Sequence, residues 1–175
     1  MHLVEIKETF MDYPDNESLA VIAYLSGCAH FCPSCQNQDL QDPSYGDYVT
    51  PEELANKIKI YALRANTNKL VFSGGDPLYN YAELIETLDL LSDFDICIYT
   101  GYDINKAKDY LQTCKHHPLY LKCGTYDETQ RDPNSGKDEH KFILASKNQA
   151  FYKWDGLRNI YYPISKGNVL EFNDE

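Results

Sequence analysis

Short apolar runs alternate along the chain with longer segments in which apolar residues recur at helical spacing. The short runs have the length and bounds typical of buried strands, and they cover residues 19–25, 69–72, 95–99 and 119–122. The helical spacing predicts helices over residues 51–64, 81–91 and 105–112. Weaker strand patterns cover residues 140–144 and 159–164. The sequence contains no internal repeat, low-complexity tract or linker that would interrupt this alternation.

The first predicted helix has a clear start signal. Thr50 is placed to act as its N-cap, Pro51 to occupy its first position, and Glu53 to complete a capping box. Strands that alternate with helices predict an α/β fold with an open, mostly parallel sheet and right-handed crossovers. In such folds the functional loops follow the carboxyl ends of the strands.

Composition narrows the class of protein. The chain has 175 residues, enough for one domain over residues 1–175, and 43% of them are hydrophobic, so we expect a packed core. Its formal net charge is −11. Such a surface repels phosphate and anionic lipid, so we expect neither nucleic-acid nor membrane partners. Since no apolar run approaches the roughly 18 residues of a membrane span and the N-terminus lacks a signal-peptide pattern, we predict a cytoplasmic location.

Three of the six cysteines lie in one short segment directly after the first strand, with the spacing C-x3-C-x2-C: Cys28, Cys32 and Cys35. Three thiolates on one loop are suited to hold an iron–sulfur cluster and leave one iron open for a substrate. The alternative is a zinc site completed by His30 or another ligand, although structural zinc sites usually have paired C-x2-C knuckles. The remaining cysteines lack paired spacing; we expect Cys97 in the core and Cys123 packed at a strand end.

Distinctive loops follow the other predicted strands as well. Gly74 and Gly75 follow the second strand, and glycines let a ligand approach the backbone closely. Asp76 comes next; it is a candidate site residue or, alternatively, the cap of the following helix. Thr100 and Tyr102 follow the third strand, and a Cys-Gly pair follows the fourth. Four unusual loops at one sheet edge predict a single active site.

Four segments together resemble the radical S-adenosylmethionine (SAM) enzymes, and more closely the activating enzymes of anaerobic ribonucleotide reductase. The segments are residues 26–37, 72–78, 99–102 and 145–149. The resemblance implies a partial (β/α) TIM-like barrel of the radical SAM type, a [4Fe–4S] cluster on Cys28, Cys32 and Cys35, and SAM as a second cofactor. It further implies that SAM is contacted by a set of residues from three loops: Ser34, Cys35, Gln36, Gly74, Gly75, Asp76 and Thr100.

The resemblance also implies partners. These are the large subunit of anaerobic ribonucleotide reductase, in which a glycyl radical is formed, and an electron donor such as flavodoxin. Another glycyl-radical enzyme or a small-molecule substrate remains an alternative, and a zinc-binding interaction module is the alternative from another class. The family usually has an acidic residue where this chain has Cys123, and Lys122 before it is basic. We expect Tyr102 to be a packed aromatic residue and His30 to face solvent.

Overall fold

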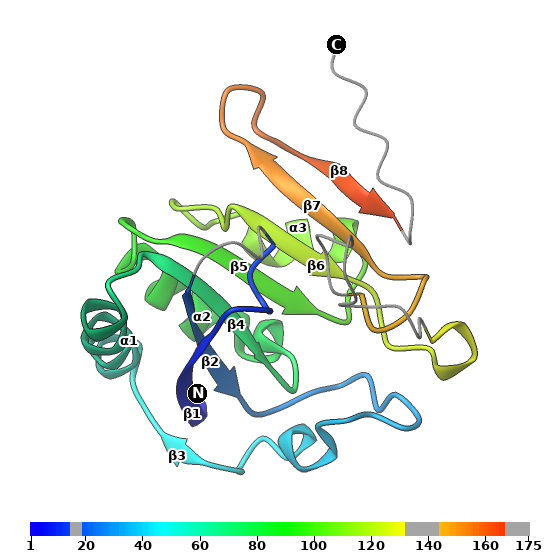
Figure 1. Cartoon of the computed structure of the whole chain (residues 1–175), viewed down its shortest axis with the longest axis horizontal. Helices are drawn as coiled ribbons and strands as arrows, with labels where there is room; N and C mark the ends of the chain where they lie inside the picture. The colour runs from blue at the N-terminus through cyan, green and yellow to red at the C-terminus, as the bar shows by residue number, and fades with distance from the viewer. Residues whose placement is uncertain (15–18, 132–143, 167–175) are drawn as a thin grey trace.

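The computed structural model describes residues 1–14, 19–131 and 144–166 (Figure 1). The strands of these residues form one eight-stranded sheet in the order β3-β1-β2-β4-β5-β6-β7-β8. Its centre is parallel, and its four central strands are β2 (Ala20–Leu25), β4 (Lys69–Gly74), β5 (Asp95–Thr100) and β6 (Tyr120–Cys123). The predicted α/β fold with an open sheet is therefore confirmed, and the sheet matches a partial barrel.

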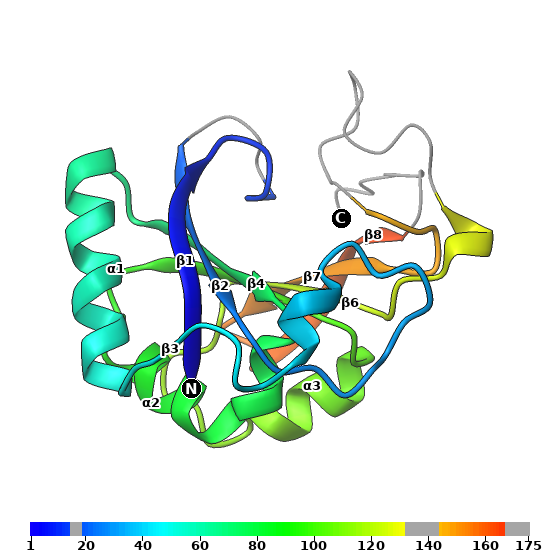
Figure 2. The same ribbon diagram turned by 90° about the horizontal axis from the view of Figure 1, so that it is seen from below.

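Three helices connect the parallel strands and cover one face of the sheet (Figure 2). They are α1 (Pro51–Ala65), α2 (Tyr81–Asp89) and α3 (Ile104–Leu111). The predicted capping box is present, because the Thr50 side chain accepts from the Glu53 N–H while the Glu53 carboxylate accepts from the Thr50 N–H. The predicted second helix ends two residues early, at Asp89, but Leu91 still packs in the core.

Antiparallel strands extend both edges of the parallel centre. β1 (His2–Thr9) and β3 (Asp47–Tyr48) lie on one side, and β7 (Ala150–Asp155) and β8 (Ile160–Lys166) on the other. The predicted strand over residues 159–164 is confirmed as β8. The weaker pattern over residues 140–144 lies almost entirely outside the described residues. The sequence did not predict β1, β3 or β7: a register shift between Leu3 and Glu5 breaks the alternation of β1, β3 is very short, and β7 mixes aromatic with charged residues.

Alternation along the central strands separates two apolar layers. Residues such as Phe72 and Ile98 face the helices in the larger layer, which also contains Cys123. Cys97 and Phe151 belong to a smaller layer on the opposite face, which we call the inner face. The predicted core position of Cys97 and the predicted packing of Cys123 are both confirmed, since each is buried.

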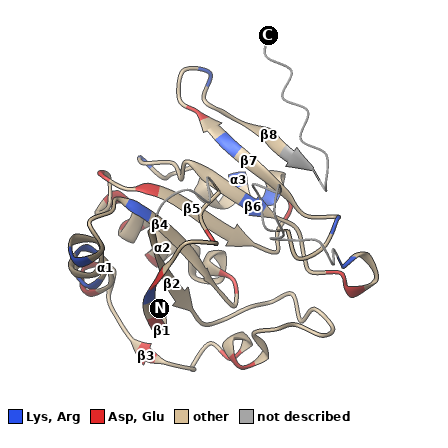
Figure 3. Cartoon of the chain, viewed as in Figure 1, with Lys and Arg blue, Asp and Glu red and all other residues tan. Residues whose placement is uncertain are grey.

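Charged residues lie mostly on the helices, the loops and the ends of the strands (Figure 3). Within the described residues, the charged side chains that are buried belong to Asp76 and Lys122, and both lie at or near the carboxyl ends of parallel strands. In the same part of the chain no helix is long and apolar enough to cross a membrane.

Candidate functional site

A cavity of about 330 Å³ opens at the carboxyl ends of the parallel strands. This volume is in the range of small-molecule sites. Its wall includes residues from the loops after β2, β4, β5 and β6, namely Cys28, Cys32, Cys35, Gly74, Gly75, Thr100, Gly101, Gly124 and Thr125. The prediction that the four loops share one edge of the sheet is confirmed, because they line one cavity; that this cavity is the active site stays a prediction.

All three clustered cysteines are free thiols and line the cavity. Cys28 is buried, whereas Cys32 and Cys35 are partly exposed. Backbone N–H groups already lie near two of the sulfurs, from His30 to Cys28 Sγ at 3.5 Å and from Asn37 to Cys35 Sγ at 3.4 Å. Burial raises the pKa of the Cys28 thiol, and the N–H group of His30 acts in the opposite direction because it stabilises the thiolate.

The Gly-Gly loop after β4 is fastened to the segment that carries the cysteines. The N–H of Gly75 donates to the carbonyl of Leu25 at 2.9 Å, and the N–H of Asp76 donates to the carbonyl of Gly27 at 2.8 Å. The Asn37 side chain donates to the carbonyl of Gly74 at 3.2 Å. Gly74 has a φ of +126°, a conformation that side chains disfavour, so glycine is needed there.

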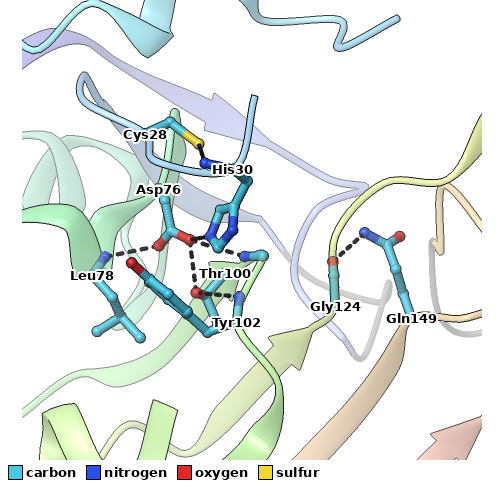
Figure 4. A network of polar contacts seen from close by, with 9 residues as sticks. Cys28, His30, Asp76, Leu78, Thr100, Tyr102, Gly124 and Gln149 are labelled. Carbon is cyan, nitrogen blue, oxygen red and sulfur yellow. Dashed lines mark hydrogen bonds and ion pairs between the residues drawn. The ribbon is translucent and has the colours of Figure 1, made fainter. Parts of the chain in front are cut away.

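The Asp76 carboxylate is buried at the centre of a polar network (Figure 4). One oxygen accepts from the Leu78 N–H at 2.9 Å and caps the short helix that follows. The other accepts from the Thr100 hydroxyl and the Gly101 N–H, both at 2.9 Å. The capping alternative for Asp76 is therefore correct, and both carboxylate oxygens are used within the protein.

The prediction that His30 faces solvent is wrong. Its side chain is only 12% exposed, and ring atom Nε2 lies 2.6 Å from the second Asp76 oxygen. The ring also packs edge-on against Tyr102, with 4.4 Å between the ring centroids. Tyr102 is thus the packed aromatic residue that the sequence predicted. The error arose because an isolated loop histidine gives no sign of a partner that lies 46 positions away in the sequence.

The other predicted SAM contacts divide into two groups. Gln36 and Thr100 line the cavity together with both glycines and Cys35. Ser34 and Asp76 do not belong to the lining. Ser34 is exposed and donates a hydrogen bond from its hydroxyl to the Glu128 carboxylate, so its side chain is turned toward the loop after β6.

The weakest segment of the resemblance, residues 145–149, forms a turn beside the cavity. The Gln149 side chain accepts from the N–H groups of Ala145 and Ser146 at 2.9 and 3.2 Å. Its amide nitrogen donates to the carbonyl of Gly124 at 2.9 Å (Figure 4). Gln149 therefore joins this turn to the end of β6, and both Ala145 and Gln149 line the cavity.

Several cavity residues on the inner face were missed by the sequence analysis: Asp12, Tyr24, Tyr99 and Lys122. The sequence signal that could have identified this part of the cavity was Lys122, a basic residue in an otherwise apolar and aromatic strand. Its Nζ lies 4.5 Å from the centroid of the Tyr99 ring, and β5 and β6 pair these two residues in register. Burial lowers the pKa of Lys122 to about 8. Neighbouring charges such as Asp12 partly oppose that shift.

Replacement of Lys122 by methionine should stabilise the protein at pH 7. The pKa of Lys122 falls from 10.5 to about 8 on folding, so the unfolded chain binds more protons between these values. The contribution of Lys122 to stability should thus rise with pH through that window, and below it the charge destabilises the fold by up to about 3 kcal/mol. Burial raises the pKa of Cys97 and Cys123, and these thiols act in the opposite direction in both proteins. We expect Lys122→Met to raise the free energy of unfolding at pH 7 by about 1 to 3 kcal/mol, and the difference between the variant and the unmodified protein to shrink at pH 10. Urea titrations at pH 7 and pH 10 measure both effects.

A matched control for this prediction is available on α3. The exposed Lys106 also lies over a tyrosine ring, with its Nζ 4.7 Å from the centroid of Tyr110. Lys106→Met should change stability by less than about 0.5 kcal/mol, because it removes an exposed charge. A Lys122 variant that loses stability at pH 7, or that differs from the unmodified protein by the same amount at pH 7 and pH 10, would contradict the prediction.

The cysteine loop fits an iron–sulfur cluster better than a single metal ion. Three free thiols line one cavity and two already receive N–H groups, the type of contact that tunes cluster sulfurs. Over the described ranges, no group of three His, Cys, Asp or Glu residues is arranged to hold one metal ion. His30 was one of the ligands considered for the zinc alternative, and its Nε2 is directed at Asp76 instead.

Comparison with known proteins agrees with this site. Residues 17–150 match a family described as a 4Fe-4S single cluster domain. An anaerobic ribonucleoside-triphosphate reductase-activating protein of Vibrio cholerae is 32% identical over 136 residues, covering 69% of this chain and 86% of the relative. A protein of the same name from Enterobacteria phage T4 is 26% identical over 153 residues, covering 82% of this chain and 94% of the relative.

The fold, the cavity and these matches define an iron–sulfur protein of the radical SAM class, which uses a [4Fe–4S] cluster together with SAM. Within that class, the chain belongs to the family of the anaerobic ribonucleoside-triphosphate reductase-activating proteins. A third member, from Haemophilus influenzae, is 28% identical over 132 residues and covers 70% of this chain and 84% of that protein.

Proposed function

We propose that this protein generates the glycyl radical of an anaerobic ribonucleotide reductase. When bound, the cluster and SAM supply a one-electron cleavage whose carbon radical takes a hydrogen atom from a glycine Cα of the partner. The observation that carries the proposal is the cavity at the sheet edge, where three free thiols and the Gly-Gly loop share one wall. The names of the relatives support the choice of partner.

Each wall of the cavity has a defined task in this proposal. Cys28, Cys32 and Cys35 ligate the cluster and leave one iron open to the cavity. Gly74 and Gly75 present their backbone in the cavity wall to the amino-acid part of SAM, and their lack of side chains lets the loop pack against the backbone of the cysteine segment. Gln36 and Thr100 complete the SAM site. Ser34 and Asp76 take part through their backbone or by holding the loops, because their side chains are bonded elsewhere.

A protein substrate suits this site better than a small molecule does. Phe31 lies between the cluster cysteines, and its side chain is 68% exposed. Its φ of +47° is uncommon for a residue with a side chain. Exposed aromatic residues are enriched at the centres of protein interfaces. Another glycyl-radical enzyme would fit the same edge, so identification of the partner is part of the test.

The electron must come from outside the protein. We propose a small redox protein such as flavodoxin as the donor, and a cytosolic location, where thiols remain reduced. Cys32 and Cys35 are partly exposed, so the cluster that they ligate would lie near the surface and within reach of such a donor.

The experiment is an anaerobic activation assay with the reconstituted protein, SAM, a reductant and the reductase subunit of the same organism. We expect an electron paramagnetic resonance doublet from a glycyl radical on the reductase, in proportion to the 5′-deoxyadenosine released. A reductase whose radical glycine is replaced by alanine is the control and should give no doublet. Release of 5′-deoxyadenosine without a radical on the reductase, but with one on another glycyl-radical enzyme, would overturn the choice of partner and retain the chemistry.

A further inference from the structure

The side chain of His30 connects the cysteine loop to the rest of the site. His30 lies between Cys28 and Cys32 in the sequence, but its ring turns away from the sulfurs toward Asp76 (Figure 4). The ring nitrogen Nε2 and the carboxylate oxygen are 2.6 Å apart, at a position where the Asp76 side chain is 1% exposed. Among the described residues, the partners of this carboxylate are His30, Leu78, Thr100 and Gly101, and of these His30 alone belongs to the cysteine loop.

The space for the ring is provided by the loop after β5. A methyl group on Gly101 would lie 2.4 Å from Cδ2 of His30, so only glycine at this position admits the imidazole. The Gly101 N–H and the Thr100 hydroxyl bind the same carboxylate oxygen as the ring does. The Tyr102 ring packs edge-on against the imidazole. The loops after β2, β4 and β5 therefore meet at one carboxylate.

The backbone N–H of His30 makes a second contact, with the sulfur of Cys28. Its N–H group lies 3.5 Å from Cys28 Sγ, within the range for a hydrogen bond to sulfur. A ring that is fixed at one end fixes the peptide to which it is attached, because few rotatable bonds separate the imidazole from the N–H group. The position of this donor at the sulfur thus depends on the contact between the ring and Asp76.

We propose that His30 and Asp76 are positioning residues that hold the cysteine loop in its cluster-binding shape and keep the His30 N–H on the Cys28 sulfur. We call this pair the His30–Asp76 latch. Hydrogen bonds to the sulfurs help to set the reduction potential of an iron–sulfur cluster. The latch would therefore raise the potential, because a donor at the sulfur stabilises the more negative, reduced cluster.

A buried carboxylate is costly unless several donors compensate it, and Asp76 has four. An apolar residue would fill the same volume without any requirement for partners. A cap for the following helix needs just one of these donors, the Leu78 N–H. The remaining three come from two other loops, which is the arrangement expected of a residue whose role is to join them.

The first test uses the protein without its cluster. The variants are His30→Ala, Asp76→Asn and the double variant, with the exposed His116→Ala as control. Each single latch variant should lower the melting temperature by about 3 to 10 °C, and the double variant by clearly less than the sum. The control should leave it unchanged. Additive losses would show that the two side chains do not act together and would overturn the proposal.

The second test measures the reduction potential of the reconstituted cluster by spectroscopic titration, without any reductase. His30→Ala should shift the potential to more negative values and lower the yield of bound iron. His30→Gln, whose amide can still donate to Asp76, should recover part of both losses. A potential equal to that of the unmodified protein in His30→Ala would refute the latch. Because the assay needs no partner protein, that result would leave the proposed function untouched.

Discussion

Replacement of Cys32 by alanine should abolish the reductive cleavage of SAM. Cys32 is the middle residue of the three-cysteine segment, is partly exposed and lines the cavity. Its loss leaves two thiols for a cluster that needs three. Residues that only support metal ligands already cost about 10- to 100-fold in affinity or activity when they are mutated, so removal of a ligand should cost more. Anaerobic reconstitution followed by measurement of 5′-deoxyadenosine tests this directly.

The chain offers a matched control for the loss of a thiol. Cys97 is fully buried in the smaller apolar layer and is absent from the cavity wall. Cys97→Ala should lower stability by about 1 kcal/mol, because a small buried group is removed, and should leave the iron content unchanged. Full activity of the Cys32 variant, or an equal loss of iron in both variants, would contradict our assignment of the cluster ligands.

The parallel centre of the fold could be predicted because its signals are local. Each central strand is a short apolar run, and the capping box at Thr50 and Glu53 depends on neighbouring residues alone. Three of the antiparallel edge strands, β1, β3 and β7, were missed because their pattern depends on tertiary contacts. In β7, Phe151 faces the core whereas the following residues are half-buried, so no regular alternation marks the strand. The sheet predicted from such runs therefore lacks most of its antiparallel strands and retains β8.

The residues of the candidate site also fall into those that the sequence could predict and those that it could not. The three cysteines and the glycines after β4 could be identified because each motif consists of residues that are close together in the sequence. The roles of His30 and Lys122 depend on partners in other strands and loops, namely Asp76 and Tyr99. The sequence also cannot show that both oxygens of Asp76 are already bonded within the protein. Contact between distant residues is the part of this site that a single sequence leaves out.

Replacement of Gly75 by alanine should separate the Gly-Gly loop from the cysteine loop. A methyl group at this position would lie 2.4 Å from the carbonyl oxygen of Leu40 and 2.5 Å from that of Gly27. Both atoms belong to the backbone, so neither can rotate away as a flexible side chain would. Gly27 and Leu40 lie on either side of the cysteines in the sequence and are joined by a 2.8 Å backbone hydrogen bond. The clash therefore acts on the base of the loop that carries the cluster.

Overpacking of this kind costs about 1 to 3 kcal/mol, or roughly 3 to 12 °C in melting temperature for a chain of this size. We expect Gly75→Ala to show this loss and to bind SAM at least about tenfold more weakly, because the backbone that SAM would approach moves. Gly156→Ala is the control, since its methyl group would meet no atom closer than 3.5 Å. Calorimetry of the two variants and equilibrium binding of SAM to the reconstituted proteins compare them. If Gly75→Ala kept both its melting temperature and its SAM affinity, the cysteine and Gly-Gly loops could move independently, and the close backbone contact would not be what shapes the site.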